Sequence, residues 1–162
     1  MPTMINGLDI RPARLDDAQG IADLLRAIGW FAAHEGTTRE DAEFQVRRLL
    51  ESAKQGAPQA PLFLVAAHPG LNIGGYCAVH WLPVAVQLGW DAYVSELFVH
   101  PDARAQRIGG QLLEQAVQTA RERGCKRIWL VNDRNRESYQ RGFYGKQGWS
   151  EQTDMARLVL TL

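Results

Sequence analysis

The sequence predicts one α/β domain of the α+β type, with a mixed, mostly antiparallel central sheet flanked by helices. Segments with helical periodicity are interspersed with extended segments rich in β-branched and aromatic residues. Two of the extended segments are separated by a short turn signal, which is typical of an antiparallel hairpin. The 162 residues, 46% of them hydrophobic, are enough to bury one core, so we expect a single domain over residues 1–162.

The first part of the chain predicts a strand and a helix. Leu8–Arg11 is a short strand that ends at Pro12, and the helix begins at Asp16 or Asp17 and ends at Gly29. The helix is predicted because its apolar positions recur at helical spacing. These positions are Ile21, Leu24, Leu25 and Ile28.

A loop over Trp30–Gly36 leads to a second helix. Thr37 and Glu40 are spaced as a capping box, in which each side chain satisfies a backbone amide of the other residue. We expect this helix to end at Gly56. Its predicted buried stripe is Ala42, Val46, Leu49, Leu50 and Ala53.

Three extended segments follow this helix. Leu62–Ala67 and Ile73–Trp81 predict a hairpin, because Pro69-Gly70 and Asn72 between them favour a turn. After a break at Pro83, the segment Tyr93–Val99 predicts a third strand.

The remainder of the chain predicts a helix, a strand, a helix and a strand. An amphipathic helix ends at Gly124, and the apolar segment Arg127–Val131 predicts a short buried strand. Arg136–Tyr144 predicts another helix and Met155–Leu162 a last strand. The apolar face of the amphipathic helix is Ile108, Leu112, Leu113, Ala116, Val117 and Ala120.

Charge and composition argue against several function classes. Eighteen basic residues balance eighteen acidic ones, so the chain as a whole has no attraction to nucleic acid or to a membrane surface. The two cysteines and four histidines lack metal-ligand spacing, and no metal site is predicted. Residues 1–10 lack a signal-peptide pattern and no apolar run is long enough to span a bilayer, so we expect a cytoplasmic protein.

The segment after the third extended stretch is the best candidate for a ligand site. A strand ends in Phe98 and Val99, and the residues Arg104–Gly110 then begin the amphipathic helix. The first amides of a helix have no partner within it and, with the helix dipole, attract phosphate oxygens. Gly109 and Gly110 allow close approach of a ligand, and Arg104 and Arg107 add positive charge. Relief of crowding by the glycines, with both arginines in solvent, explains the same residues equally well.

The segment resembles the GNAT superfamily of acyl-CoA-dependent N-acyltransferases, whose signature is V-x-P, then R-G-x-G-x-[GA], then a helix with paired leucines. Two positions depart from the signature, because Ala105 and Arg107 stand where glycines are usual. Gly74-Gly75-Tyr76 and the segment Phe143–Trp149 resemble two further family segments. The signature positions that match are Val99, Pro101, Arg104, Gly109, Leu112 and Leu113.

The resemblance implies acetyl-CoA as the acetyl donor. It places the acetyl group between two splayed central strands, here Tyr93–Val99 and Arg127–Val131. The backbone of Phe98 and Val99 would bind the pantetheine arm, and Asn135 would add a side-chain contact unless it caps a helix. The pyrophosphate would be held by Arg104, Ala105, Gln106, Arg107, Ile108, Gly109 and Gly110.

The resemblance also implies two catalytic side chains. Tyr144 matches the family's general acid, which protonates the leaving thiolate, with Tyr139 as the alternative acid. Tyr144 could instead be a core aromatic. Glu96 is the candidate base or substrate-amine anchor, because a glutamate in an apolar strand is costly to bury, although an ion pair with an arginine would also explain it. His80 and His100 are weaker alternatives.

The amine acceptor site is expected in the loops Trp30–Gly36 and Trp81–Trp90. Trp30 and Trp81 could stack on a cation and Glu35 could attract one. The predicted function is transfer of acetyl from acetyl-CoA to a primary amine of a small molecule by direct attack. A protein or peptide amine as acceptor, and a non-catalytic acyl-CoA-binding module, are the alternatives. Dimers are common among relatives, so a homodimer is compatible with the resemblance.

Overall fold

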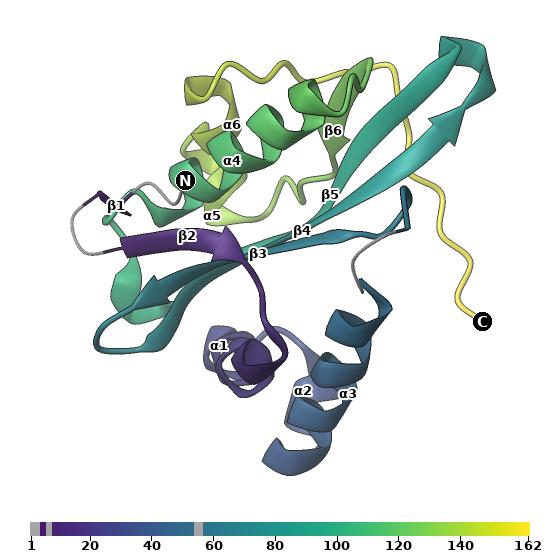
Figure 1. Ribbon diagram of the computed structural model, residues 1–162. Coiled ribbons are helices and arrows are strands. Elements are labelled where there is room, and N and C mark those ends of the chain that lie inside the picture. Colours follow the sequence, from purple (N-terminus) through teal and green to yellow (C-terminus); the bar gives the residue numbers. More distant parts are fainter. Residues whose placement is uncertain (1–3, 6–7, 54–56) are drawn as a thin grey trace. The chain divides into compact units, whose positions relative to one another are not determined.

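The computed structural model describes residues 4–5, 8–53 and 57–162 (Figure 1). The chain divides into two compact units, Met1–Leu130 and Val131–Leu162. Within the described residues, no helix is long and apolar enough to cross a membrane. Two sequence predictions fall on residues that are not described. They are part of the signal-peptide prediction, at residues 1–3 and 6–7, and the predicted helix end at Gly56.

The first unit is built on a six-stranded sheet with the strands in chain order. Every neighbouring pair is antiparallel except the last, which is parallel, so the predicted mixed sheet is confirmed. The predicted first strand and the hairpin of the next two are also confirmed. The strands are β1 (Met4–Ile5), β2 (Leu8–Pro12), β3 (Leu62–His68), β4 (Asn72–Val84), β5 (Gly89–Val99) and β6 (Arg127–Leu130).

The predicted break at Pro83 is wrong, because β4 runs through it and pairs Pro83 with Trp90 of β5. The ladder with β3 ends at Val79, so Pro83 lies where β4 has only β5 as a neighbour. Proline is tolerated on such an edge because its missing N–H need not bond to a second strand. The segment Trp81–Trp90 is therefore a hairpin end, closed by a short 3-10 turn over Ala85–Gln87.

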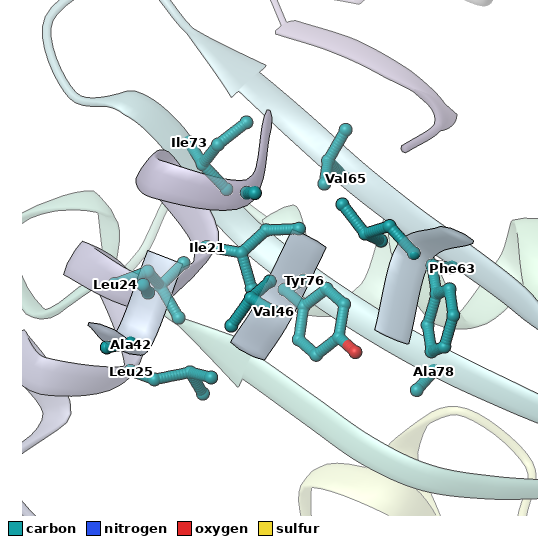
Figure 2. Close-up of a cluster of buried hydrophobic side chains, with 13 residues drawn as sticks. Ile21, Leu24, Leu25, Ala42, Val46, Phe63, Val65, Ile73, Tyr76 and Ala78 are labelled. Atoms are coloured by element: carbon teal, nitrogen blue, oxygen red, sulfur yellow. The ribbon is translucent and has the colours of Figure 1, made fainter. Parts of the chain in front are cut away.

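Helices α1 (Ala18–Ile28) and α3 (Arg39–Ser52) cover one face of the sheet, and α4 (Ile108–Glu122) covers the other (Figure 1). Between α1 and α3 the predicted loop contains one short helix, α2 (Ala32–Glu35). One cluster of buried apolar side chains forms between α1, α3 and the strands β3 and β4 (Figure 2).

The ends of the first two long helices follow the predictions with small shifts. Gly29 ends α1 in the left-handed region, as expected. The N-cap of α3 is Thr38, whose hydroxyl accepts from the Asp41 amide at 3.1 Å, one residue later than the predicted capping box. Leu49 was expected in the buried stripe but is 59% exposed, because it lies beyond the edge of the stripe formed by Ala42, Val46 and Leu50.

Helix α4 packs unusually close to β4. A Cβ atom at Gly75 would lie 2.4 Å from Cγ2 of Ile108 and 2.8 Å from Cδ1 of Leu112. Both side chains are fully buried, so the absence of a side chain at Gly75 is what lets the first turn of α4 contact the strand. As predicted, α4 ends just before Gly124, which has φ +71°.

The last part of the chain differs most from its predictions. The expected helix Arg136–Tyr144 is two short helices, α5 (Glu137–Gln140) and α6 (Phe143–Lys146), because Gly142 between them adopts φ +65°. The predicted strand Met155–Leu162 is wrong: those residues have no ladder partner among the described strands, and their side chains are exposed. Strand β6 was predicted to be buried, but Trp129 is exposed because β6 is the edge strand of the sheet.

Candidate active site

One edge of β5 is left open by the sheet. The parallel ladder with β6 covers only four residue pairs and ends at Val94 and Leu130. Strand β5 continues over Ser95–Val99, where within the described residues it pairs with β4 alone. Backbone N–H and C=O groups on such an edge can form hydrogen bonds with the main chain or amide groups of an added partner. The predicted pantetheine contacts, Phe98 and Val99, both lie on this open stretch.

A β-bulge marks the start of the open stretch. Ala78 of β4 lies opposite Glu96, but Val79 lies opposite Val94, so Ser95 is an extra residue in β5. The exposed Ser95 hydroxyl is 2.8 Å from Nε2 of His80 on the neighbouring strand. Bulges are over-represented beside active sites because they re-aim side chains. No local pattern in the sequence signals this bulge.

The predicted phosphate cradle lies just beyond the C-terminal end of β5. A short 3-10 turn over Pro101–Ala103 leads to α4, whose first residues are Ile108, Gly109 and Gly110. No described backbone carbonyl accepts from the amides of these three residues. Three unpaired amides at the positive end of a 15-residue helix form an anion-binding arrangement.

Two residues of the cradle have a left-handed backbone without being glycine. Ala105 has φ +64° and Arg107 has φ +60°. Arg107 is the N-cap of α4, so it lies just before the helical backbone. This backbone conformation explains why glycine is usual at these two positions in the family, since left-handed backbone costs a non-glycine residue roughly 1–2 kcal/mol. Turns of this kind also direct successive amides toward one point, as anion-binding nests do.

The cradle is tied to the β3–β4 hairpin through a histidine. The Nε2 atom of His68 is 3.2 Å from Oε1 of Gln106. The Gly70 amide donates to the other ring nitrogen of His68 at 3.1 Å, so that nitrogen is an acceptor and the proton is on Nε2. His68 therefore donates to Gln106, and this contact was not foreseen from the sequence.

Glu96 projects from the face of the sheet that α1 and α3 partly cover. Its Oε2 accepts a hydrogen bond of 3.0 Å from the Tyr76 hydroxyl. The predicted alternative, an ion pair with arginine, is not present among the described residues. Burial, the charge of Glu96 and this hydrogen bond all raise the pKa of Tyr76, so its hydroxyl stays a donor.

Three aromatic side chains gather next to Glu96. Phe98 has its ring centroid 5.0 Å from Phe31 and 6.5 Å from Trp30, both in edge-on contact. Phe98 and Glu96 are two residues apart on β5 and therefore share a face of the sheet. Trp30 is 46% exposed, and Glu35 lies exposed on α2. Phe98 thus shares a face of the sheet with Glu96 and contacts the ring of Trp30.

Trp81 does not belong to this cluster. It is 4% exposed, and the guanidinium of Arg123 lies 4.3 Å from the centre of its ring. Along β4 it alternates with His80 and so shares the opposite face with Val79, on the side of α4. Trp81 therefore cannot stack on an amine acceptor beside Glu96, and we exclude it from the acceptor site.

The unit Val131–Leu162 holds the remaining candidates. The Tyr144 ring, at the start of α6, contacts Phe143 and Trp149 edge-on at 4.9 and 6.2 Å. The Tyr139 hydroxyl donates to Glu151 at 2.9 Å, a bond that raises the pKa of Tyr139. Asn135 is exposed, its backbone N–H donates to Oδ1 of Asp133 at 2.9 Å, and the N-cap of α5 is Arg136 rather than Asn135.

Neither cysteine is a candidate nucleophile. Cys77 is fully buried, and burial with the nearby charge of Glu96 raises its pKa to about 12. Burial also raises the pKa of the Cys125 thiol. A thiol with a raised pKa stays protonated at neutral pH and is a poor nucleophile. Within the described residues, no group of three potential ligands could hold a metal ion.

Comparison with known proteins identifies the family of the chain. The sequence model of the Acetyltransferase (GNAT) family matches residues 26–149. The chain belongs to this family. The predicted likeness to the GNAT family is thereby confirmed, and acetyl transfer is the activity class of the protein.

The proteins that are similar to this chain carry different names. Uncharacterized N-acetyltransferase YhfO of Bacillus subtilis (strain 168) is 27% identical over 156 residues, which are 96% of this chain and 98% of that protein. The crystal structure of a transcriptional regulator from Bacillus halodurans C-125 has 25% identity and a TM-score of 0.78, covering 96% and 99% of the two chains. An aminoglycoside acetyltransferase from an uncultured soil metagenomic sample shares the fold, with 21% identity, a TM-score of 0.74 and 99% of each chain covered.

Proposed function

We propose that this protein transfers the acetyl group of acetyl-CoA to a primary amine of a small molecule by direct attack. The observation that carries the proposal is the open edge of β5 over Ser95–Val99, which leads directly to the unpaired amides of α4 and bears Glu96. One strand thus connects a main-chain docking edge, an anion cradle and a carboxylate.

The residues of the cradle fit the diphosphate of coenzyme A. The amides of Ile108, Gly109 and Gly110 supply donors, and Arg104 and Arg107 supply charge beside them. The backbone of Phe98 and Val99 would pair with the amide-containing pantetheine arm, which requires no particular side chain. Bound acetyl-CoA supplies an acetyl group activated as a thioester.

Glu96 would hold the amine and accept its proton, because only a neutral nitrogen has a lone pair for attack. A carboxylate on the same face as Phe98, whose ring contacts Trp30, offers an ammonium both a counter-charge and aromatic surfaces. Glu35 would add negative charge at the entrance. An amine of small size, with an apolar part that contacts the rings, is the acceptor that this arrangement favours.

Tyr144 would protonate the departing thiolate, a role we assign from its place in the segment Phe143–Trp149. A phenol suits this step because it is protonated at neutral pH and can donate to sulfur. Asn135 would contact the pantetheine arm. Tyr139 is the weaker candidate for the acid, because its proton is engaged by Glu151.

A screen of amines with acetyl-CoA, followed by release of the coenzyme A thiol, tests the proposal. We expect turnover with at least one free small amine. Turnover with peptides alone would show a protein acceptor, and binding of acetyl-CoA with no turnover on any amine would show a non-catalytic module. Failure of both acetyl-CoA and coenzyme A to raise the melting temperature would contradict the proposal altogether, since a ligand at one hundred times its Kd adds about 2.7 kcal/mol.

Tyr144→Phe tests the acid, with Tyr139→Phe as the matched control. Loss of a general acid lowers kcat and kcat/KM together, by about 10²-fold at the lower end for a good leaving group, and leaves the affinity for acetyl-CoA unchanged. We expect this result for Tyr144→Phe and little change for Tyr139→Phe. The reverse pattern would assign the acid to Tyr139.

A further inference from the structure

Among the described residues of the apolar cluster between α1, α3, β3 and β4, the Tyr76 hydroxyl is the one polar side-chain atom. The other members, from α1, α3, β3 and β4, are aliphatic side chains and Phe63. Figure 2 shows the hydroxyl oxygen of Tyr76 directed away from Leu24 and Leu25, toward the side of Phe63 and Ala78. A buried hydroxyl costs stability unless it forms a hydrogen bond, so its partner is structurally required.

That partner is the carboxylate of Glu96. Tyr76 lies opposite Phe98 and Ala78 lies opposite Glu96, so Tyr76 and Glu96 are diagonal neighbours on one face of the sheet. The hydroxyl donates to Oε2 at 3.0 Å. No other hydrogen bond or ion pair to Glu96 is present among the described residues, which leaves the second oxygen for a substrate.

The tyrosine ring itself has little freedom to move. Tyr76 is 5% exposed, and its ring stacks on Phe63 with centroids 6.2 Å apart and an interplanar angle of 22°. Packed core side chains occupy single rotamers, so the hydroxyl is a fixed donor. A fixed donor to one carboxylate oxygen restricts the rotation of a side chain that is otherwise only half-buried.

We propose that Tyr76 is a positioning residue that orients the Glu96 carboxylate toward the amine acceptor, an inference that rests on the proposed function of Glu96. Through this one hydrogen bond, the packed core around Tyr76 fixes the orientation of a side chain in the site. The bond is a charge-assisted one, which is stronger than a bond between neutral groups. Tyr76 is expected to affect the reaction only through Glu96.

A purely structural bond would behave differently. In that case Glu96 would serve only to satisfy the buried hydroxyl, and Tyr76→Phe would change the melting temperature without affecting catalysis. The two roles are separated by a double-mutant cycle measured in kinetics, because residues that act as a unit give non-additive losses.

The experiment compares Tyr76→Phe, Glu96→Gln and the double variant. Phenylalanine keeps the ring and its packing on Phe63. We expect Tyr76→Phe to lower kcat/KM for the amine by roughly tenfold, the scale of a hydrogen bond to a charged group, with KM for acetyl-CoA unchanged. In the Glu96→Gln background the same substitution should cause no further loss.

Glu96→Asp provides a second route to the same conclusion. The charge remains, but the shorter side chain cannot reach the Tyr76 hydroxyl. The loss of kcat/KM for the amine in Glu96→Asp should therefore resemble the loss in Tyr76→Phe. Combining the two substitutions should cause no additional loss. Full activity of Tyr76→Phe beside an impaired Glu96→Gln, or additive losses in the double variant, would overturn the positioning role alone. Full activity of Glu96→Gln would overturn the proposed role of Glu96 and the positioning role with it.

Discussion

Apolar side chains pack on both faces of the central sheet, but the two faces differ in the polar bonds that add to this packing. On the face toward α4, contact is apolar and close, with Gly75 of β4 against Ile108 and Leu112. On the other face, ion pairs supplement the apolar cluster: Arg11 of β2 binds Asp17 at the start of α1, and Arg39 of α3 binds Asp23 of the neighbouring helix α1. Among the described residues no ion pair joins α4 to the sheet.

The difference matches what each face supports. The α4 face carries the first turn of the helix that forms the cradle, and close packing fixes that turn against β4. The face toward α1 and α3 must leave Glu96 and Phe98 accessible, so part of it cannot be covered by packed side chains. Directional hydrogen bonds and ion pairs can hold helices there without filling the space beside β5.

Asp17→Asn should have the largest effect on stability. The Asp17 carboxylate accepts two bonds from Arg11, at 2.7 and 3.0 Å, and one from the Arg14 amide at 2.7 Å. Breaking a buried pair costs about 3 kcal/mol, measurable by urea unfolding. Asp23→Asn, which removes an exposed pair with Arg39, should cost less than about 1 kcal/mol. Equal losses of unfolding free energy in the two variants would show that the buried ion pair contributes no more to stability than the exposed one.

The Asp17 contribution should also depend on pH. Burial alone would raise the pKa of Asp17, but the bonds from Arg11 and Arg14 and their charges outweigh it and lower the pKa. A carboxyl with a lowered folded pKa contributes stability that is fully present above its ordinary pKa, about 3.9, and is lost as pH falls through the folded value. The difference in unfolding free energy between parent and Asp17→Asn should therefore be constant at neutral pH and shrink in acid.

Gly75→Ala and Gly20→Ala compare the packing on the two faces. Gly75→Ala places Cβ against two buried side chains and should cost about 2 kcal/mol. On α1, a Cβ at Gly20 would meet Cγ1 of Ile73 at 2.6 Å, but alanine also favours the helix by about 1 kcal/mol, so the net loss should be smaller. Gly75→Ala should in addition raise KM for acetyl-CoA by displacing Ile108. An unchanged KM would separate the packing of α4 from the cradle.

Trp81→Phe and Trp30→Ala test which face receives the amine. Trp81 is buried under Arg123, so Trp81→Phe should cost about 1–2 kcal/mol of stability and leave KM for the amine unchanged. Trp30→Ala should raise that KM roughly fivefold, the scale of a cation–π contact, with little loss of stability. An amine KM that responds to Trp81 and not to Trp30 would place the acceptor on the α4 side.

Arg107→Gly and Arg107→Ala separate the backbone of the cradle from its charge, with the smallest expected effects. Both variants remove the guanidinium, so both should raise KM for acetyl-CoA to a similar extent. Only glycine relieves the left-handed backbone at φ +60°, so Arg107→Gly should be about 1 kcal/mol more stable than Arg107→Ala in thermal unfolding. Equal melting temperatures of the two variants would contradict a strained N-cap.

Sequence reasoning predicted the elements whose signals are local. The apolar spacing of α1 and α4, the ends of these helices at Gly29 and Gly124, and the β3–β4 hairpin were all predicted and are all present. The predictions failed where a local sequence pattern is compatible with more than one structure. Gly142 divides a predicted helix in two, and the alternating residues Met155–Leu162 form no strand, because a strand also needs a partner beside it.

For the site, the sequence by itself determined the residue types: a glycine-containing helix start with arginines, a glutamate in an apolar strand, and aromatic residues in the loop before α2. Only the tertiary structure decided which of these residues come into contact. The extra residue Ser95 in β5, the bond from Tyr76 to Glu96 and the burial of Trp81 on the opposite face all depend on strand register. Register is set by pairing between residues about 20 positions apart, and a one-residue shift moves a side chain to the other face, so local patterns cannot specify it.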